Sequence, residues 1–290
     1  MKIFLDCLPC MLRQSLEASR MATDDNQLQS DIMSECIYLL NNFKEYRNPP
    51  EVAREIHRIV KNRTGVSDPY NKIKQDDIQK ALKLFSRLKQ FVQVKQDRLY
   101  WALRISSIGN VLDSGINYGI KIEDCIDYEL TKDFAVCDIE IFKQKAEYNK
   151  NLLIIGDNAG ETVFDRLLIE EIPNMDVTYA VRNMPIINDA VIDDAYASGL
   201  NSCARIISTG CDMPGVVLSE CSREFREAFY NAGIVICKGQ GNYETLSDSD
   251  RELFFLLKAK CPVTSGLIGV GLNDYVFKYY NPQAIGGKKK

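Results

Sequence analysis

The chain has 290 residues, of which 46% are hydrophobic and 26% charged, a composition that excludes disordered and fibrous proteins. Its net charge is −4, and residues 151–290 hold 13 basic against 18 acidic residues, which argues against nucleic acid as the main partner. No apolar run approaches the ~18 residues of a membrane span. At the start of the chain, Asp6 interrupts the apolar residues before they are long enough for the apolar region of a signal peptide. We therefore expect a cytoplasmic protein with no membrane contact.

The chain from residue 9 to about residue 113 has the periodicity of helices. Apolar residues recur three and four positions apart, as at Cys36, Ile37 and Leu40. Asn48 before two prolines predicts the start of a helix, and Gly65 predicts its end. Four or five helices and no strand are expected here, and we assign residues 1–115 to a helical domain.

From residue 116 to 287, short apolar runs alternate with amphipathic segments, the pattern of parallel strands connected by helices. Strands are predicted at residues 152–155, 177–181, 204–208, 234–237 and 262–265. Helices are predicted up to residue 148 and at residues 162–171, 189–198, 220–232 and 248–259. The expected fold class is α/β, a three-layer α/β/α core with a mostly parallel sheet beside the N-terminal all-helical domain. Residues 288–290 form a lysine tail.

Polar loops follow the first four predicted strands. They contain residues 156–161, 182–189, 209–215 and 238–244. Because the carboxyl ends of parallel strands share one edge of a sheet, we expect these loops to meet. Carboxylate and amide oxygens there would bind a hard divalent ion, and a lysine would hold phosphoryl charge. One such loop would be an ordinary turn of Asn, Asp and Gly, but four at one edge favour a site.

These loops resemble the ordered motifs of the damage-control phosphatase family, formerly a domain of unknown function (number eighty-nine). The matching strings include Gly156-Asp157-Asn158-Ala159-Gly160-Glu161, Pro185-Ile186-Ile187-Asn188-Asp189, Gly210-Cys211-Asp212-Met213-Pro214-Gly215, Lys238-Gly239-Gln240-Gly241-Asn242-Tyr243-Glu244 and the upstream Ile108-Gly109-Asn110-Val111-Leu112-Asp113. The resemblance covers about the whole chain. Cys7-Leu8-Pro9-Cys10 at the start resembles the prokaryotic branch of the family.

The resemblance implies a metal-dependent phosphatase that hydrolyses small phosphate monoesters, such as sugar phosphates or damaged phosphometabolites. It places a divalent metal, Mg²⁺, Mn²⁺, Co²⁺ or Ni²⁺, between Asp157, Asn158 and Asp189. Oxygen ligands alone do not select among these ions. The oligomeric state is left open.

The same resemblance gives the roles of the remaining site residues. Asp157 and Lys238 would be catalytic, and the substrate phosphate would bind Lys238 with help from Asn110 and from Arg182 or Asp212. We expect in-line attack by a metal-activated water, although a covalent phosphoaspartate at Asp157 is chemically possible.

Other features of the sequence receive structural interpretations. Cys7 and Cys10 could form half a zinc site or a redox pair, but no second Cys-x-x-Cys exists. His57 is the only histidine, which argues against a Ser-His-Asp or Cys-His hydrolase. Two alternative functions remain, a methyltransferase that uses S-adenosylmethionine and a non-catalytic metal or metabolite binder, because a doubly wound sheet supports both.

Overall fold

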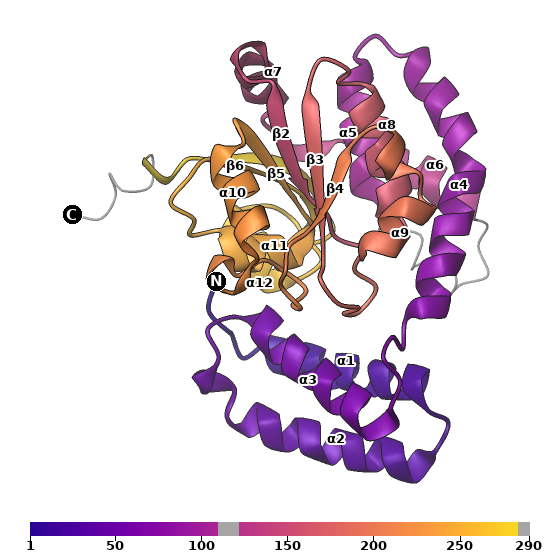
Figure 1. The fold of residues 1–290 in the computed structure, drawn as a ribbon, viewed down its shortest axis with the longest axis vertical. Coiled ribbons are helices and arrows are strands. Elements are labelled where there is room, and N and C mark those ends of the chain that lie inside the picture. Colours follow the sequence, from indigo (N-terminus) through magenta and orange to yellow (C-terminus); the bar gives the residue numbers. More distant parts are fainter. Residues whose placement is uncertain (110–121, 284–290) are drawn as a thin grey trace.

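A computed structural model describes residues 1–109 and 122–283 (Figure 1). Its helices are α1 (Cys7–Ala22), α2 (Asn26–Asn41), α3 (Pro49–Thr64), α4 (Asn71–Gln93), α5 (Arg98–Ile108), α6 (Ile122–Leu130), α7 (Ile139–Tyr148), α8 (Glu161–Glu170), α9 (Ile192–Ala197), α10 (Arg223–Asn231), α11 (Gly239–Leu246) and α12 (Pro262–Ile268). Its strands are β1 (Phe134–Cys137), β2 (Asn151–Ile155), β3 (Asp176–Val181), β4 (Arg205–Ser208), β5 (Ile234–Lys238), β6 (Leu253–Lys258) and β7 (Tyr275–Tyr280).

The strands form one seven-stranded sheet in the order β1-β7-β6-β5-β2-β3-β4. Every neighbouring pair is parallel except β6 and β7, which are antiparallel. The carboxyl ends of β2 to β6 therefore lie at the same edge of the sheet. The predicted α/β class with a mostly parallel sheet is confirmed.

Alternate residues of the central strands enter two different apolar cores. On β2, Leu152 and Ile154 pack in a core with α4, α5, α7 and α8, whereas Leu153 and Ile155 pack in a core with α10, α11 and α12. This alternation follows from the two-residue period of a strand. Because both faces are covered, the central strands are apolar throughout and form the middle of three layers.

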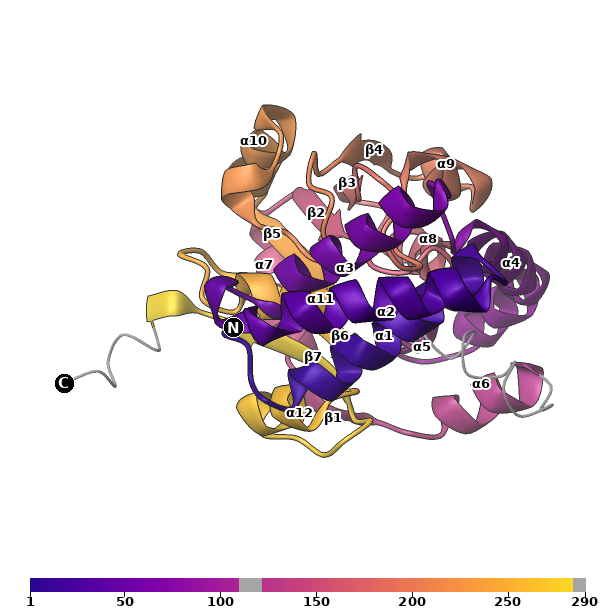
Figure 2. The ribbon, with the colours of Figure 1, turned by 90° about the horizontal axis from the view of Figure 1, so that it is seen from below.

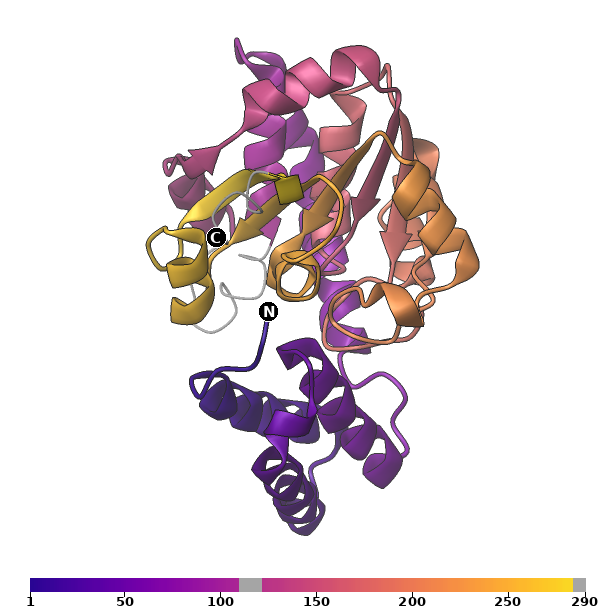
Figure 3. The same ribbon diagram turned by 90° about the vertical axis from the view of Figure 1, so that its left-hand side faces the viewer.

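Helices α1 to α3 form a third apolar core of their own, beneath the rest of the chain in Figures 1 and 3. The local chemistry fixes α3 as expected, because the Asn48 side chain caps the Glu51 amide and Gly65 ends the helix in a left-handed conformation. Figure 2 views the molecule from this side and shows α3 crossing in front of the sheet. Arg54 on α3 contacts Glu220 at 2.5 Å, in the segment after β4.

Helices α4 and α5 differ from the first three because they pack against α8 and the sheet. The predicted domain division at residue 115 stays a prediction. The predicted residue Asn110 and the lysine tail lie outside the described residues. Among the described residues, no helix is both long and apolar enough to cross a membrane.

Two predicted elements near the C-terminus are wrong in type. The helix expected at residues 248–259 is mainly strand β6, and the strand expected at 262–265 is the first part of α12. Strand β6 lies between β5 and β7 in the sheet, and every residue of Leu253–Leu257 is buried. Its sequence is therefore apolar throughout and shows neither helical nor alternating periodicity. Pro262, at the first turn of α12, fits a helix start because that position needs no amide donor.

Further elements escaped the sequence prediction. Strands β1 and β7 form one side of the sheet, and α11 occupies residues that were expected to be a loop. The segment Gly239–Leu246 begins with glycines and asparagine, which are turn residues, and only its packing against β6 and α3 makes it helical. The expected helix at 189–198 is shorter, because Ala190 donates its amide to Asp157 instead.

Candidate functional site

The loops after β2 and β3 are joined by backbone hydrogen bonds. The Ala190 amide donates to the Asp157 carbonyl at 2.8 Å, and the Ala159 amide donates to the Asn188 carbonyl at 2.8 Å. Between them, Asn158 and Asp189 form an isolated antiparallel bridge. The three predicted metal ligands, Asp157, Asn158 and Asp189, are thus brought together at the carboxyl edge of the sheet.

Arg182 lies beneath this loop junction and is fully buried. Its Nε donates to Asp189 Oδ2 at 2.6 Å, and its Nη1 donates to Asn242 Oδ1 at 3.2 Å. Its Nη2 lies 3.9 Å from Asp157 Oδ1 and has no hydrogen-bond partner among the described residues. Arg182 therefore holds Asp189 in place and leaves Asp157 only partly compensated.

The carboxyl groups of Asp157 and Asp189 are both perturbed. Burial, followed by the nearby carboxylates of Asp189 and Glu161, raises the pKa of Asp157 well above its ordinary value, while Arg182 and Lys260 oppose the rise. Burial also raises the pKa of Asp189, against the opposing charge of Arg182. Two buried carboxylates with one guanidinium form a place where an additional cation would be stabilised.

The donor set fits a hard divalent ion. Asp157 and Asp189 supply carboxylate oxygens and Asn158 supplies an amide, which are ligand types that Mg²⁺ and related ions use while keeping waters. In the described part of the chain, no group of three or more His, Cys, Asp or Glu residues is placed to hold a metal ion. The candidate centre therefore depends on Asn158 as its third ligand.

Lys238 occupies the end of β5, as predicted, but its ammonium is buried. Its Nζ donates to the Ser106 carbonyl at 2.9 Å and forms ion pairs with Asp165 at 2.5 Å and Glu161 at 3.0 Å. Burial alone would lower the pKa of Lys238, but the carboxylates of Asp165 and Glu161 outweigh it and raise the pKa. In this arrangement Lys238 is committed to two carboxylates inside the protein.

Gly239 brings the end of β5 against the loop after β2. Its φ of +76° lies in the left-handed region, and a Cβ atom there would collide with Asp157 Oδ2. Only glycine satisfies both conditions. The glycine that follows Lys238 is thus required by the close approach of the Asp157 carboxylate.

The predicted substrate residue Asp212 is more exposed than Arg182 and Lys238. Asp212 has a half-exposed side chain, and its Oδ1 lies 3.5 Å from Nη1 of Arg54 on α3. It is not part of the buried cluster around Asp157. Asn110 lies outside the described residues; Gly109, which precedes it, packs against Glu161 at the start of α8.

Two residues near the site were not singled out from the sequence. Lys260 is exposed, two residues beyond β6, and its charge lowers the pKa of both Asp157 and Glu161. A strand predicted at residues 253–258 would have placed Lys260 in a loop at the carboxyl edge of the sheet and made it a candidate site residue. Asn242 donates to the carbonyls of Lys238 and Gly156, at 2.6 and 3.1 Å, and so ties β5 to the loop after β2.

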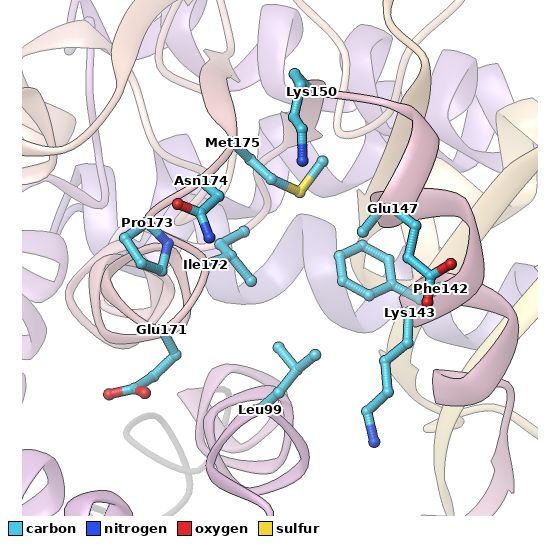
Figure 4. A pocket seen from close by; sticks show the side chains of 11 residues that line it. Leu99, Phe142, Lys143, Glu147, Lys150, Glu171, Ile172, Pro173, Asn174 and Met175 are labelled. Atoms are coloured by element: carbon cyan, nitrogen blue, oxygen red, sulfur yellow. The ribbon is translucent and has the colours of Figure 1, made fainter.

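A cavity of about 290 Å³ lies elsewhere in the molecule (Figure 4). Phe142 and Lys143 of α7 line it, together with Leu99 of α5 and Met175. Lys150 and Met175 directly precede β2 and β3, so this cavity is at the amino ends of the strands, opposite the candidate site.

Comparison with known proteins identifies the family of the chain. Residues 3–276 match the model of the damage-control phosphatase ARMT1-like domain. The chain belongs to this family. A damage-control phosphatase of Pyrococcus horikoshii is 35% identical over 271 residues, which are 91% of this chain and 93% of that protein. A damage-control phosphatase of Archaeoglobus fulgidus is 31% identical over 287 residues, which are 96% and 99% of the two chains.

A solved structure agrees with this assignment. The crystal structure of a DUF89 family protein from Pyrococcus horikoshii matches with a TM-score of 0.89 and 34% identity, and covers 97% of this chain and 100% of that chain. The family predicted from the sequence motifs is therefore confirmed. The names of the two relatives support a phosphatase role for this member of the family.

Proposed function

We propose that this protein is a divalent-metal-dependent phosphatase that hydrolyses small phosphate monoesters, such as sugar phosphates or damaged phosphometabolites, in the cytoplasm. The observation that carries the proposal is the meeting of Asp157, Asn158 and Asp189 at the carboxyl edge of the sheet. Two largely buried carboxylates with raised pKa values share the single guanidinium of Arg182, so a further cation would stabilise their ionised forms. The names of the related proteins point to the same chemistry.

Asp157, Asn158 and Asp189 would hold the ion, with Mg²⁺, Mn²⁺, Co²⁺ and Ni²⁺ as candidates. Such an ion supplies Lewis-acid polarisation of the phosphoryl group and lowers the pKa of water. Arg182 keeps Asp189 oriented for this task through its 2.6 Å ion pair. We favour water as the nucleophile, because an Asp157 engaged with a cation is a poor one.

Cationic side chains at this edge would bind the substrate phosphate. Lys260 is exposed and its charge acts on Asp157 and Glu161, so we assign its ammonium to the dianionic phosphate of an incoming substrate. Lys238, to which the family resemblance assigned this role, acts in the proposal as a fixed positive charge behind the site, because two carboxylates already engage it. Asp212 would meet substrate hydroxyl groups at the rim. The phosphate contact predicted for Asn110 stays a prediction, because this residue lies outside the described residues.

The test is phosphate release from p-nitrophenyl phosphate by chelator-treated protein resupplied with each of the four metals. We expect metal-dependent turnover, its loss in Asp157→Asn, and a raised KM in Lys260→Ala. Lys83→Ala, an exposed lysine on α4, is the matched control and should behave as wild type. No turnover with any metal, on this ester or on a panel of sugar phosphates, would contradict the proposal and favour a binding protein or a methyltransferase.

A further inference from the structure

Glu161 connects two parts of the candidate site. It is the first residue of α8 and its side chain is 1% exposed. Its Oε1 accepts a hydrogen bond of 3.0 Å from Asn158 Nδ2, and its Oε2 lies 3.0 Å from Lys238 Nζ. Each carboxylate oxygen therefore faces a different donor.

The contact with Glu161 fixes the direction of the Asn158 amide. An asparagine side chain carries a donor at Nδ2 and an acceptor at Oδ1, on opposite sides of one carbon atom. Because Nδ2 donates to Glu161, Oδ1 turns away from Glu161. A cation can be bound by the oxygen and not by the amide nitrogen, so the orientation decides whether Asn158 is a ligand.

Glu161 is itself held from two further directions. Lys238, which engages Glu161, is also paired with Asp165, and Asp165 accepts a 2.6 Å hydrogen bond from the Tyr179 hydroxyl. On the other side, Gly109 packs so closely that a Cβ atom there would collide with Glu161 Cγ. Such a buried chain of contacts can keep one side chain in a single orientation.

We propose that Glu161 is a positioning residue, which orients the Asn158 amide so that Oδ1 can serve as the third metal ligand. The inference rests on the proposed metal site and adds to it the residue that makes an asparagine competent as a ligand. Outer-shell partners of this kind orient metal ligands in many proteins, and their loss costs roughly 10- to 100-fold in metal affinity.

The variant Glu161→Gln tests this directly, because an amide has one acceptor end while a carboxylate has two. Lys238 requires an acceptor, so the oxygen of the introduced amide would face Lys238 and its NH₂ group would face Asn158. Asn158 would then turn its own oxygen toward that NH₂ group and present its Nδ2 to the cation. We expect Mn²⁺ affinity, measured by isothermal titration calorimetry, to fall roughly 10- to 100-fold.

A second substitution separates orientation from charge. Asn158→Asp presents an oxygen in either orientation, so in this background Glu161→Gln should change Mn²⁺ affinity less than about threefold. If Glu161 acted only through its negative charge, Glu161→Gln would lower Mn²⁺ affinity by the same factor in the wild type and in Asn158→Asp, because the two effects would be independent. Glu170→Gln, at the other end of α8, is the matched control and should bind Mn²⁺ as wild type.

Each result has a definite meaning. A large loss in Glu161→Gln that disappears in the Asn158→Asp background supports the inference. Wild-type affinity in Glu161→Gln, or equal losses in both backgrounds, would overturn it while the wild-type protein still binds Mn²⁺ and releases phosphate. Absence of Mn²⁺ binding and turnover in the wild type would overturn the proposed function as well. Thermal unfolding of the metal-free variants shows that each protein is folded.

Discussion

Two buried clusters in this molecule have the same charges and different geometries. Lys74 lies between Asp68 and Asp194, with its Nζ at 2.8 and 2.9 Å from their carboxylates. Arg182 lies between Asp189 and Asp157, but its contacts are unequal, at 2.6 and 3.9 Å. The first cluster is complete by itself and joins α4 to α9.

The difference between the two clusters lies in how completely the cation is paired, and it distinguishes a structural ion group from the candidate site. In the Lys74 cluster both carboxylates reach the cation. In the Arg182 cluster Asp157 is not in hydrogen-bond contact with Arg182, and within residues 1–109 and 122–283 Nη2 of Arg182 has no hydrogen-bond partner. A net negative charge with incomplete pairing is what a binding site for a cation needs.

The largest expected effect is the loss of phosphate release when Asp157, in the Arg182 cluster, is substituted. Asp157→Asn should lower metal-dependent phosphate release by a factor on the order of 10³, because charge stabilisation in the transition state is lost. The folded protein should not be less stable, since the substitution removes repulsion between buried carboxylates. Steady-state kinetics and thermal unfolding of the same sample check both points. Full activity of the variant would place the chemistry elsewhere.

Substitution in the Lys74 cluster should instead lower stability and have little effect on activity. Lys74→Met would leave Asp194 buried without its cation, and breaking such a buried pair costs about 3–5 kcal/mol of unfolding free energy. Denaturant unfolding measures this loss. Activity per folded molecule should fall much less than in Asp157→Asn. A variant as stable as the wild type would remove the structural role assigned to Lys74.

Another buried carboxylate, Glu244, extends the comparison because it is paired with a neutral group, the side-chain amide of Gln240. Burial raises the pKa of Glu244 from 4.5 to about 7, with the Gln240 hydrogen bond opposing the rise. A carboxyl group with a raised pKa in the folded state destabilises the protein when it is ionised, so stability should decrease as pH rises from about 4.5 to 7.

Glu244→Gln should therefore be more stable than the wild type above pH 7, by up to about 3 kcal/mol, and the difference should shrink toward pH 4.5. Denaturant unfolding across this pH range measures it. Glu227→Gln, an exposed residue of α10, is the control and should show no such trend. A constant difference across the range would contradict the assignment to Glu244.

The smallest effect is stabilisation by metal. With Mn²⁺ at about 100 times its dissociation constant, the unfolding free energy should rise by about 2.7 kcal/mol, because only the folded state holds the ligands together. The rise in Tm should vanish in Asp189→Asn and persist in Lys74→Met. Equal shifts in wild type and Asp189→Asn would mean that Mn²⁺ binds at another place.

Much of the core was predictable from local patterns. Strands β2 to β5 were found because each is a short apolar run bounded by turn residues, and their loops were expected to meet at one edge. Strand β6 was missed because an apolar run buried on both faces carries no periodicity. That error also concealed Lys260, which follows the end of β6 and whose charge acts on Asp157.

The sequence by itself determined the family, the α/β class and the chemical types at the carboxyl edge of the sheet, because motif order and strand spacing are local properties of the chain. Only the tertiary structure decided which charges meet. Lys238 and Lys260 both follow strands, yet packing around α8 buries the first between Glu161 and Asp165 and leaves the second exposed. The pairing of charges depends on contacts between residues far apart in the chain, and hydrophobic patterns do not encode those contacts.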